Sequence, residues 1–180
     1  MSLQTNKTIL SSSITTLVVV VVLGSFALSG AAVVENLRFV KATSQILEPV
    51  GLVRTIIAQQ PGFIQKPGEN IWDDLARVEQ IPSGSDHVNP WGSDVHVVAA
   101  TNVAIRIESD LPTHDCRRMA LYFINQAQGF RLLAVEAQPF EQVLWSPIYP
   151  MPENTLRDSV VDVACGKAHA ARLALVFKVR

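Results

Sequence analysis

The chain has 180 residues and a formal net charge of −1 at pH 7, from 15 basic and 16 acidic side chains. This length allows one ordinary domain with an appended segment. The near-neutral charge and a pI of about 6.4 argue against a nucleic-acid partner, because such partners require a basic surface. Hydrophobic residues make up 48% of the chain, but they are distributed unevenly along it.

Residues 8–34 contain no charged side chain, whereas Lys7 precedes them and Glu35 follows. A helix of this length would run roughly 40 Å at ~1.5 Å per residue, which exceeds the ~30 Å hydrocarbon core of a membrane. We therefore predict that residues 1–34 form a transmembrane helix segment. The small residues near Ala31 also fit a cleaved secretory signal peptide, and this alternative stays open. Both interpretations place the rest of the chain outside the cytoplasm.

Residues 35–60 are predicted to continue the same helix as an amphipathic segment, because no linker separates them from residues 8–34. Their apolar positions follow a period close to 3.6 residues: Leu37, Val40, Ile46, Leu47, Val50, Val53 and Ile57. We expect this face to pack on the remainder of a head that comprises residues 35–180. Pro49 and Gly51 predict a kink, and Pro61-Gly62 predicts the end of the helix.

The remainder of the head is predicted to be α+β. Alternating apolar residues predict a β-hairpin over 94–108, with Val103, Ile105 and Ile107 on its buried side. The other expected elements, in chain order, are a short helix over 71–78, a loop over 81–92, a helix over 111–128, a strand over 130–137, an irregular stretch over 138–158, a brief pairing over 159–164 and a strand over 173–179.

The only cysteines are Cys116 and Cys165, and neither belongs to a CxxC pair. In an oxidising compartment the expected state is one disulfide, which would join the helix over 111–128 to the C-terminal region. Two unrelated buried thiols are the alternative. The predicted fold is therefore a long N-terminal helix packed on three or four antiparallel strands, with a second helix and a C-terminal disulfide region.

Several segments in this order resemble the PilS-like type IVb pilins, a branch of the type IV pilins. They are Gln59–Phe63, Leu75–Ser83, Val88–Gly92, Val95–Val97, Ile105–Ile107 and Leu111–Cys116. The third of these segments contains the turn motif Asn89-Pro90-Trp91-Gly92. The resemblance covers about residues 17–125 and fades after Gly129. It departs from the family at the N-terminus, where no glycine precedes the apolar run and no glutamate lies within it.

The resemblance implies a structural subunit, major or minor, of a type IVb pilus that serves adhesion or conjugative mating contact. Such a chain would first cross the inner membrane once and then enter an extracellular pilus. Its expected partners are other copies of itself, bound through their N-terminal helices, the membrane, and the inner-membrane assembly machinery. A pseudopilin of a type II secretion system is one alternative. A secreted binding domain with a cleaved signal peptide is another, and processing by a prepilin peptidase stays open.

No catalytic residue, metal ligand or cofactor site is predicted, and the chain is not expected to be an enzyme. The four histidines are scattered, and His114 and Cys116 lie too close along a helix to face each other. Asp86 and Asp94 flank the turn motif but are expected to be solvated rather than to bind calcium. The three tryptophans, Trp72, Trp91 and Trp145, are expected to anchor core or loops rather than to form a sugar platform.

Overall fold

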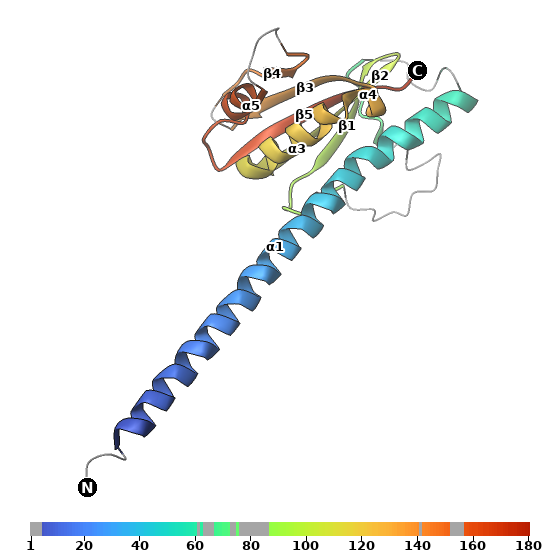
Figure 1. The fold of residues 1–180 in the computed structure, drawn as a ribbon. Helices are drawn as coiled ribbons and strands as arrows, with labels where there is room; N and C mark the ends of the chain where they lie inside the picture. The colour runs from blue at the N-terminus through green and yellow to red at the C-terminus, as the bar shows by residue number, and fades with distance from the viewer. Residues whose placement is uncertain are drawn as a thin grey trace. The chain divides into compact units, whose positions relative to one another are not determined.

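The computed structural model describes the backbone of residues 5–60, 62, 67–72, 75, 87–140, 142–151 and 157–180, and within these ranges the side chains from residue 32 onward. Its elements, in chain order, are α1 (Thr5–Gln59), β1 (Val95–Thr101), β2 (Ala104–Pro112), α3 (Thr113–Asn125), α4 (Ala127–Phe130), β3 (Leu132–Pro139), β4 (Ser146–Tyr149), α5 (Arg157–Cys165) and β5 (Ala170–Lys178) (Figure 1). The chain divides into two compact units, Met1–Arg38 and Phe39–Arg180.

The first unit is helical from Thr5 onward, and near its end Val33, Val34 and Leu37 expose 57%, 48% and 63% of their surface. Among the residues whose side chains are described, no helix combines the length and apolarity that a membrane span requires. Most of the predicted membrane segment, residues 8–34, falls outside those side chains. The transmembrane helix therefore stays a prediction.

The second unit is α+β, as predicted, but its antiparallel sheet has five strands rather than three or four, in the order β1-β2-β5-β3-β4. The hairpin is confirmed, since β1 pairs with β2 around a tight turn after Thr101. The C-terminal strand β5 lies between β2 and β3 and pairs with both, Ile107 opposite Leu175 and Val135 opposite Leu175. Because the C-terminal strand β5 lies in the centre of the sheet, a strongly apolar sequence is expected for it.

One hydrophobic core joins α1, α3 and α5 to the inward face of the sheet. Ile105 and Ile107 of β2 are buried as predicted, and so are Leu175 and Phe177 of β5. From α1 the core takes Phe39, Ala42, Ile46, Val50, Val53, Ile56 and Ile57. The last turns of α1 are fixed further by Arg54, whose Nη2 donates to the carbonyls of Phe130 at 2.7 Å and Lys178 at 2.9 Å. Burial, followed by the charge of Arg131, lowers the pKa of Arg54.

The predicted apolar face of α1 is wrong at its start. Leu37 and Val40 were assigned to the core, yet each is 63% exposed, whereas Phe39 is 8% exposed. Phe39 lies edge-on to the ring of Tyr122, at 5.8 Å between centroids, and the guanidinium of Arg118 stacks over it at 4.0 Å. Aromatic and cation–π contacts thus hold Phe39 against α3.

Three predicted element boundaries need correction. Leu111 and Pro112 were expected to begin a helix, but they pair with Ala171 and Ala170 at the end of β2, and α3 begins at Thr113. Gly129 was expected to end that helix; α3 ends at Asn125, and Gly129 lies within the separate short helix α4. The strand expected over 130–137 begins later, at Leu132, where β3 starts. Arg131 has a positive φ of 53°, so the backbone is not extended before that point.

The segment 159–164 was expected to pair as a strand, but it belongs to helix α5. Its β-branched sequence suggested a strand, whereas Val161, Ala164 and Cys165 are spaced as one helical face and are buried together. The predicted irregular stretch 138–158 contains strand β4, despite Pro147 inside it. Because β4 is the last strand of the sheet, it tolerates a proline.

The predicted helix 71–78 lies mostly outside the described residues, as do the loop residues 81–86. Trp72 and Leu75 are helical, and Oδ1 of Asn70 accepts the backbone N–H of Trp72 at 3.1 Å, as an N-cap does. The chain just before this point lies along the outer edge of β1, where Gly68 and Ile71 donate to the carbonyls of Ala99 and Val97. This segment therefore covers one edge of the sheet.

Candidate functional site

The predicted turn Asn89-Pro90-Trp91-Gly92 is a β-turn. The N–H of Gly92 donates to the carbonyl of Asn89 at 2.9 Å, with Pro90 at the second position. Gly92 has a φ of +89°, a conformation that favours glycine. Trp91 packs against the core, half-buried. The four residues are thus brought together in the predicted arrangement, directly before β1.

Asn89 connects this turn to the sheet. Its Nδ2 donates to Oγ of Ser109 at 2.9 Å and to the carbonyl of Asp110 at 2.7 Å. Its Oδ1 accepts the N–H groups of Trp91 at 2.9 Å and Ser93 at 3.0 Å. The amide thus uses both donors and both acceptor positions while only 4% exposed. The role of this turn is therefore structural, since its polar centre is fully occupied.

The predicted disulfide is present and joins α3 to α5. Cys116 and Cys165 are both fully buried, with 6.1 Å between their Cα atoms. Close beside it, Nε of Arg117 lies 3.1 Å from Oδ1 of Asp162, and Nη2 donates to the carbonyl of Gly166 at 3.0 Å. The disulfide and the ion pair thus hold α5 to α3.

Gly166 ends α5 at a point where only glycine fits. Its φ is +72°, and a Cβ placed there would lie 2.9 Å from Cγ of Pro139. Pro139 ends β3, so the close approach fixes the end of α5 against the end of that strand. This contact was not predicted, because nothing in the sequence links positions 139 and 166.

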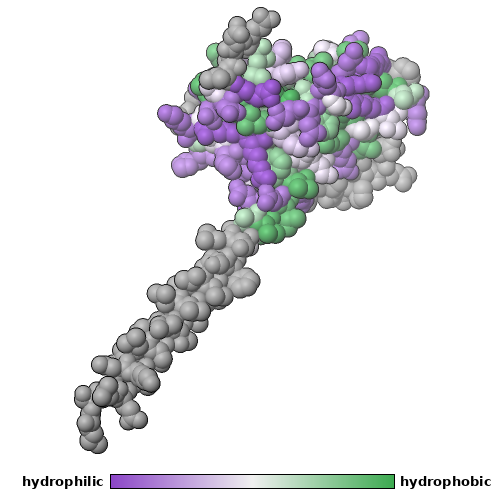
Figure 2. All heavy atoms as spheres, in the orientation of Figure 1, coloured by the Kyte–Doolittle hydropathy of each residue, from purple (hydrophilic) through white to green (hydrophobic). Residues whose placement is uncertain are grey.

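An open and partly apolar surface lies along α1 in the second unit. A groove of about 680 Å³ is lined by Phe39, Val40, Thr43, Ser44, Leu47, Glu48 and Tyr122. Val40, Ser44 and Leu47 are four and three residues apart, so they share one helix face. Figure 2 shows hydrophobic side chains gathered on α1 next to its grey part, while hydrophilic side chains cover much of the head face in view. We call this surface the α1 groove.

Sequence reasoning missed the α1 groove because it assigned Val40 and Leu47 to the same face as Ile46. The spacing of 37, 40 and 47 in fact separates from that of 39, 46, 50 and 53, which are buried. Because the two sets of apolar residues lie on the same helix, the sequence pattern was interpreted as one apolar face instead of two. The separate spacing of Val40, Ser44 and Leu47, four and three residues apart, is the sequence signal that would have distinguished the two faces.

The predicted kink residues lie inside helix α1. Pro49 is buried, Gly51 is exposed, and the helix continues through both of them to Gln59. Oγ1 of Thr55 donates to the carbonyl of Gly51 at 3.0 Å, one turn earlier in the helix. A change in helix direction at these residues stays a prediction.

The tryptophans anchor loops where the structure describes them. Nε1 of Trp72 donates to Nε2 of His87 at 2.7 Å, and the ring of Trp145 lies 4.4 Å from the guanidinium carbon of Arg106. Arg106 also pairs with Glu108 and Glu136, each at 2.5 Å, across the outer face of the sheet. Through these contacts the rings of Trp72 and Trp145 and the charge of Arg106 have partners within the molecule.

No group of three or more His, Cys, Asp or Glu side chains suited to a metal ion occurs among the described residues. Asp94 lies next to the turn motif, whereas Asp86, the other residue of the suggested calcium pair, falls outside the described residues. Cys116 is bonded to Cys165 and so has no thiol for catalysis. His114 therefore has no nucleophile at this position to activate.

Comparison with known proteins gives no match to a family model, to a curated protein or to a solved structure. The functional argument therefore depends on the chain's own residues and surfaces.

Proposed function

We propose that this chain is a filament subunit of the type IV pilin kind, with no enzymatic activity. Its N-terminal helix would hold the subunit in the inner membrane and then pack against the helices of other copies. The observation that carries the proposal is the apolar surface left open on α1, at Val33, Val34 and Leu37 in the first unit and at Val40 in the second.

The distribution of apolar side chains on α1 supports an assembly role. From Phe39 to Ile57 one face of α1 supplies the core of the head. The exposed side chains on the same helix have no such use, and exposed apolar residues that cluster commonly mark an interaction surface. Full burial of a valine or leucine side chain contributes about 1.5–3 kcal/mol, so a few such residues are enough to favour association.

The second support is the order of elements around the disulfide. A long N-terminal helix is followed by an antiparallel sheet, and a disulfide holds the C-terminal helix α5 to α3. The turn Asn89–Gly92 stands at the junction before β1, where the resemblance to PilS-like type IVb pilins requires it. A head linked in this way resists pulling and proteolysis, which an extracellular pilus must withstand.

The sequence lacks the glycine and the glutamate that the family carries at its N-terminus. The mature N-terminus is therefore the feature that has to be measured. In a retained subunit, the apolar run 8–34 stays attached to the head. In a secreted binding domain, signal peptidase removes it near Ala31. In a pseudopilin, the run is retained, but the chain appears with a secretion system rather than in surface filaments.

The test is mass spectrometry of surface filaments sheared from the source cells, with the membrane fraction as the comparison. We expect peptides of this chain in the filaments, including peptides from within residues 8–34, and the Cys116–Cys165 link under non-reducing conditions. Recovery only from the culture medium, with a mature N-terminus near Ala31, would show a secreted domain. Recovery only in short periplasmic assemblies of a secretion system would show a pseudopilin.

A further inference from the structure

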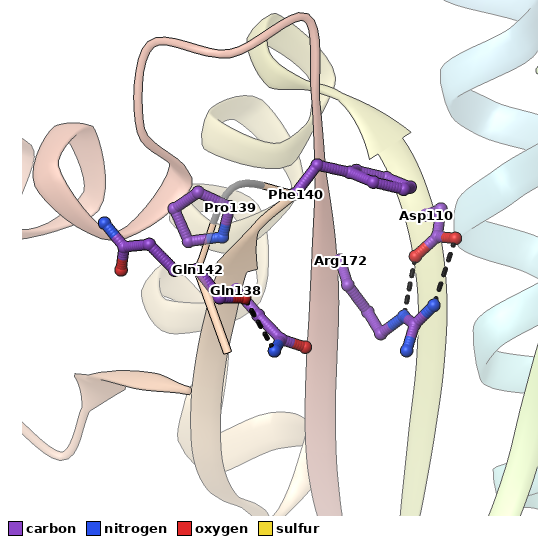
Figure 3. Close-up of a pocket in the computed structure, with 6 residues that line it drawn as sticks. All are labelled: Asp110, Gln138, Pro139, Phe140, Gln142 and Arg172. Carbon is purple, nitrogen blue, oxygen red and sulfur yellow. Dashed lines mark hydrogen bonds and ion pairs between the residues drawn. The ribbon is translucent and has the colours of Figure 1, made fainter. Parts of the chain in front are cut away.

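A small polar pocket lies on the outer face of the sheet, away from the core. Its floor is a row of three cross-strand neighbours: Asp110 of β2 is opposite Arg172 of β5, which is opposite Gln138 of β3. Pro139, Phe140 and Gln142 complete the lining, and the volume is about 170 Å³. Figure 3 shows the floor residues coming from three adjacent strands, with the ring of Phe140 extending on the side of Arg172 and Asp110.

The charges on the floor neutralise each other. Nε of Arg172 donates to Oδ1 of Asp110 at 2.8 Å, and Nη2 lies 3.4 Å from Oδ2. This hydrogen bond raises the pKa of Arg172, with the charge of Asp110 acting in the same direction. Because the two charges are paired with each other, neither is left open for an ion. The remaining lone pairs and N–H groups of the pocket favour a neutral hydrogen-bonding ligand.

Gln138 is held in one orientation. Its Nε2 donates to the carbonyls of Gln142 at 3.0 Å and Val143 at 2.7 Å. These two bonds use both amide donors, so Oε1 is left as an acceptor on the floor of the pocket. The neighbouring wall is also confined, because Pro139 lies so close to Gly166 that a Cβ at Gly166 would be 2.9 Å from its Cγ.

Phe140 gives the pocket an apolar side. Its ring is 62% exposed, although it immediately follows the buried end of β3. A large aromatic ring that is exposed beside fixed polar groups offers a flat surface for the C–H face of a ligand. The volume is below the range typical of drug-sized ligands, so one ring rather than an extended molecule fits.

We infer that this pocket binds one ring of an uncharged saccharide. A pyranose presents hydroxyls that both donate and accept, which match Asp110, Arg172 and Gln138, and an apolar ring face, which matches Phe140. The three floor residues lie on rigid strands, so the hydrogen-bonding pattern exists before the ligand arrives. This inference does not depend on filament assembly, because every residue involved belongs to the second unit.

The test is saturation-transfer difference NMR on the full chain in a zwitterionic detergent that contains no sugar. The probes are the methyl glycosides of glucose, galactose, mannose, N-acetylglucosamine and N-acetylgalactosamine, each at millimolar concentration. We expect saturation transfer to at least one of them, strongest at the ring C–H protons. Phe140→Ser and Asp110→Asn should each weaken that binding about tenfold or more, which is the loss of one good contact.

Leu144→Ser is the matched control, because Leu144 lies in the same loop, is 78% exposed and does not line the pocket. It should bind like the unchanged protein. Circular dichroism of every variant checks folding, and the exposed position of Phe140 keeps that variant interpretable if Asp110→Asn unfolds. Silence from all five glycosides would overturn the inference. So would binding that Phe140→Ser leaves unchanged.

Discussion

Nδ2 of Asn89 donates to Oγ of Ser109 at 2.9 Å, between a turn and a strand that lie 20 residues apart in the chain. Both side chains are buried, at 4% and 5% exposure. The same amide fixes the turn through the N–H groups of Trp91 and Ser93. One side chain therefore sets where the loop preceding β1 meets the sheet.

Replacing Asn89 should weaken the head clearly. Asn89→Ala leaves buried donors and acceptors at Ser109, Asp110, Trp91 and Ser93 without their partner, so we expect the free energy of unfolding to fall by about 2–4 kcal/mol. Urea denaturation measures this change. Gln128→Ala is the control, because Gln128 is exposed on α4 and should change stability by less than about 0.5 kcal/mol. An equal effect of the two substitutions would refute the structural role of Asn89.

Removing the disulfide should lower the free energy of unfolding more than replacing Asn89 does. The link between Cys116 and Cys165 spans 49 residues, and closing a loop of this size contributes about 4 kcal/mol in the chain-entropy model. The double variant Cys116→Ala, Cys165→Ala should lose roughly that amount in urea denaturation. Dithiothreitol should destabilise the unchanged protein but not the double variant. A reductant effect on the double variant as well would show that the stability difference does not come from this link.

Gly166 provides a test of the contact between α5 and β3. Gly166→Ala combines a φ of +72° with a Cβ that meets Pro139 at 2.9 Å, so we expect a loss of about 1–3 kcal/mol. Gly51→Ala is the opposite case. Gly51 lies inside α1 with nothing within 4 Å of a Cβ, and the substitution should raise stability by about 0.5–1 kcal/mol. Thermal unfolding of both variants would show the two shifts, and shifts of the same sign would contradict this reading of Gly166.

Val40 should matter for assembly and not for folding. Val40→Glu places a charge on a side chain that is 63% exposed, so the unfolding free energy should change by less than about 0.5 kcal/mol. In the α1 groove of an assembled filament the same charge would be buried without a partner, and filament yield should fall at least about tenfold.

The control for Val40 is Val163→Glu on α5, where the valine is 76% exposed and distant from the groove in sequence. Its filament yield, measured by shearing and immunoblotting, should match that of the unchanged chain. Equal yields for both variants would remove the α1 groove from the assembly surface. Loss of yield together with loss of thermal stability would attribute the Val40 effect to misfolding.

The strands and the helix α3 could be predicted where a single period dominates the sequence. Ile105 and Ile107 alternate cleanly in β2, and Cys116, Met119 and Phe123 share one face of α3. The disulfide followed from the presence of only two cysteines. In these segments local preference and burial agree, so the pattern alone is sufficient.

The prediction failed where tertiary contacts override the local pattern. Val160 and Val161 favour a strand, but α5 forms because Cys165 and Ala164 bury one helical face against α3 and β3. Pro112 suits the first turn of a helix, yet the pairing of β2 with β5 extends to it. The pocket of Asp110, Gln138 and Arg172 needed the strand register, which joins three segments far apart in the chain.

The most direct test of the filament proposal is photo-crosslinking from position 40, with a benzophenone amino acid in place of Val40 and with position 163 as the control. In filaments on intact cells, position 40 should give a ladder of covalently linked copies whose crosslinked peptides come from α1, while position 163 gives none through α1. If crosslinks from position 40 reach only lipid or unrelated proteins when filaments are present, copies of this chain do not pack through α1 and the proposal is wrong.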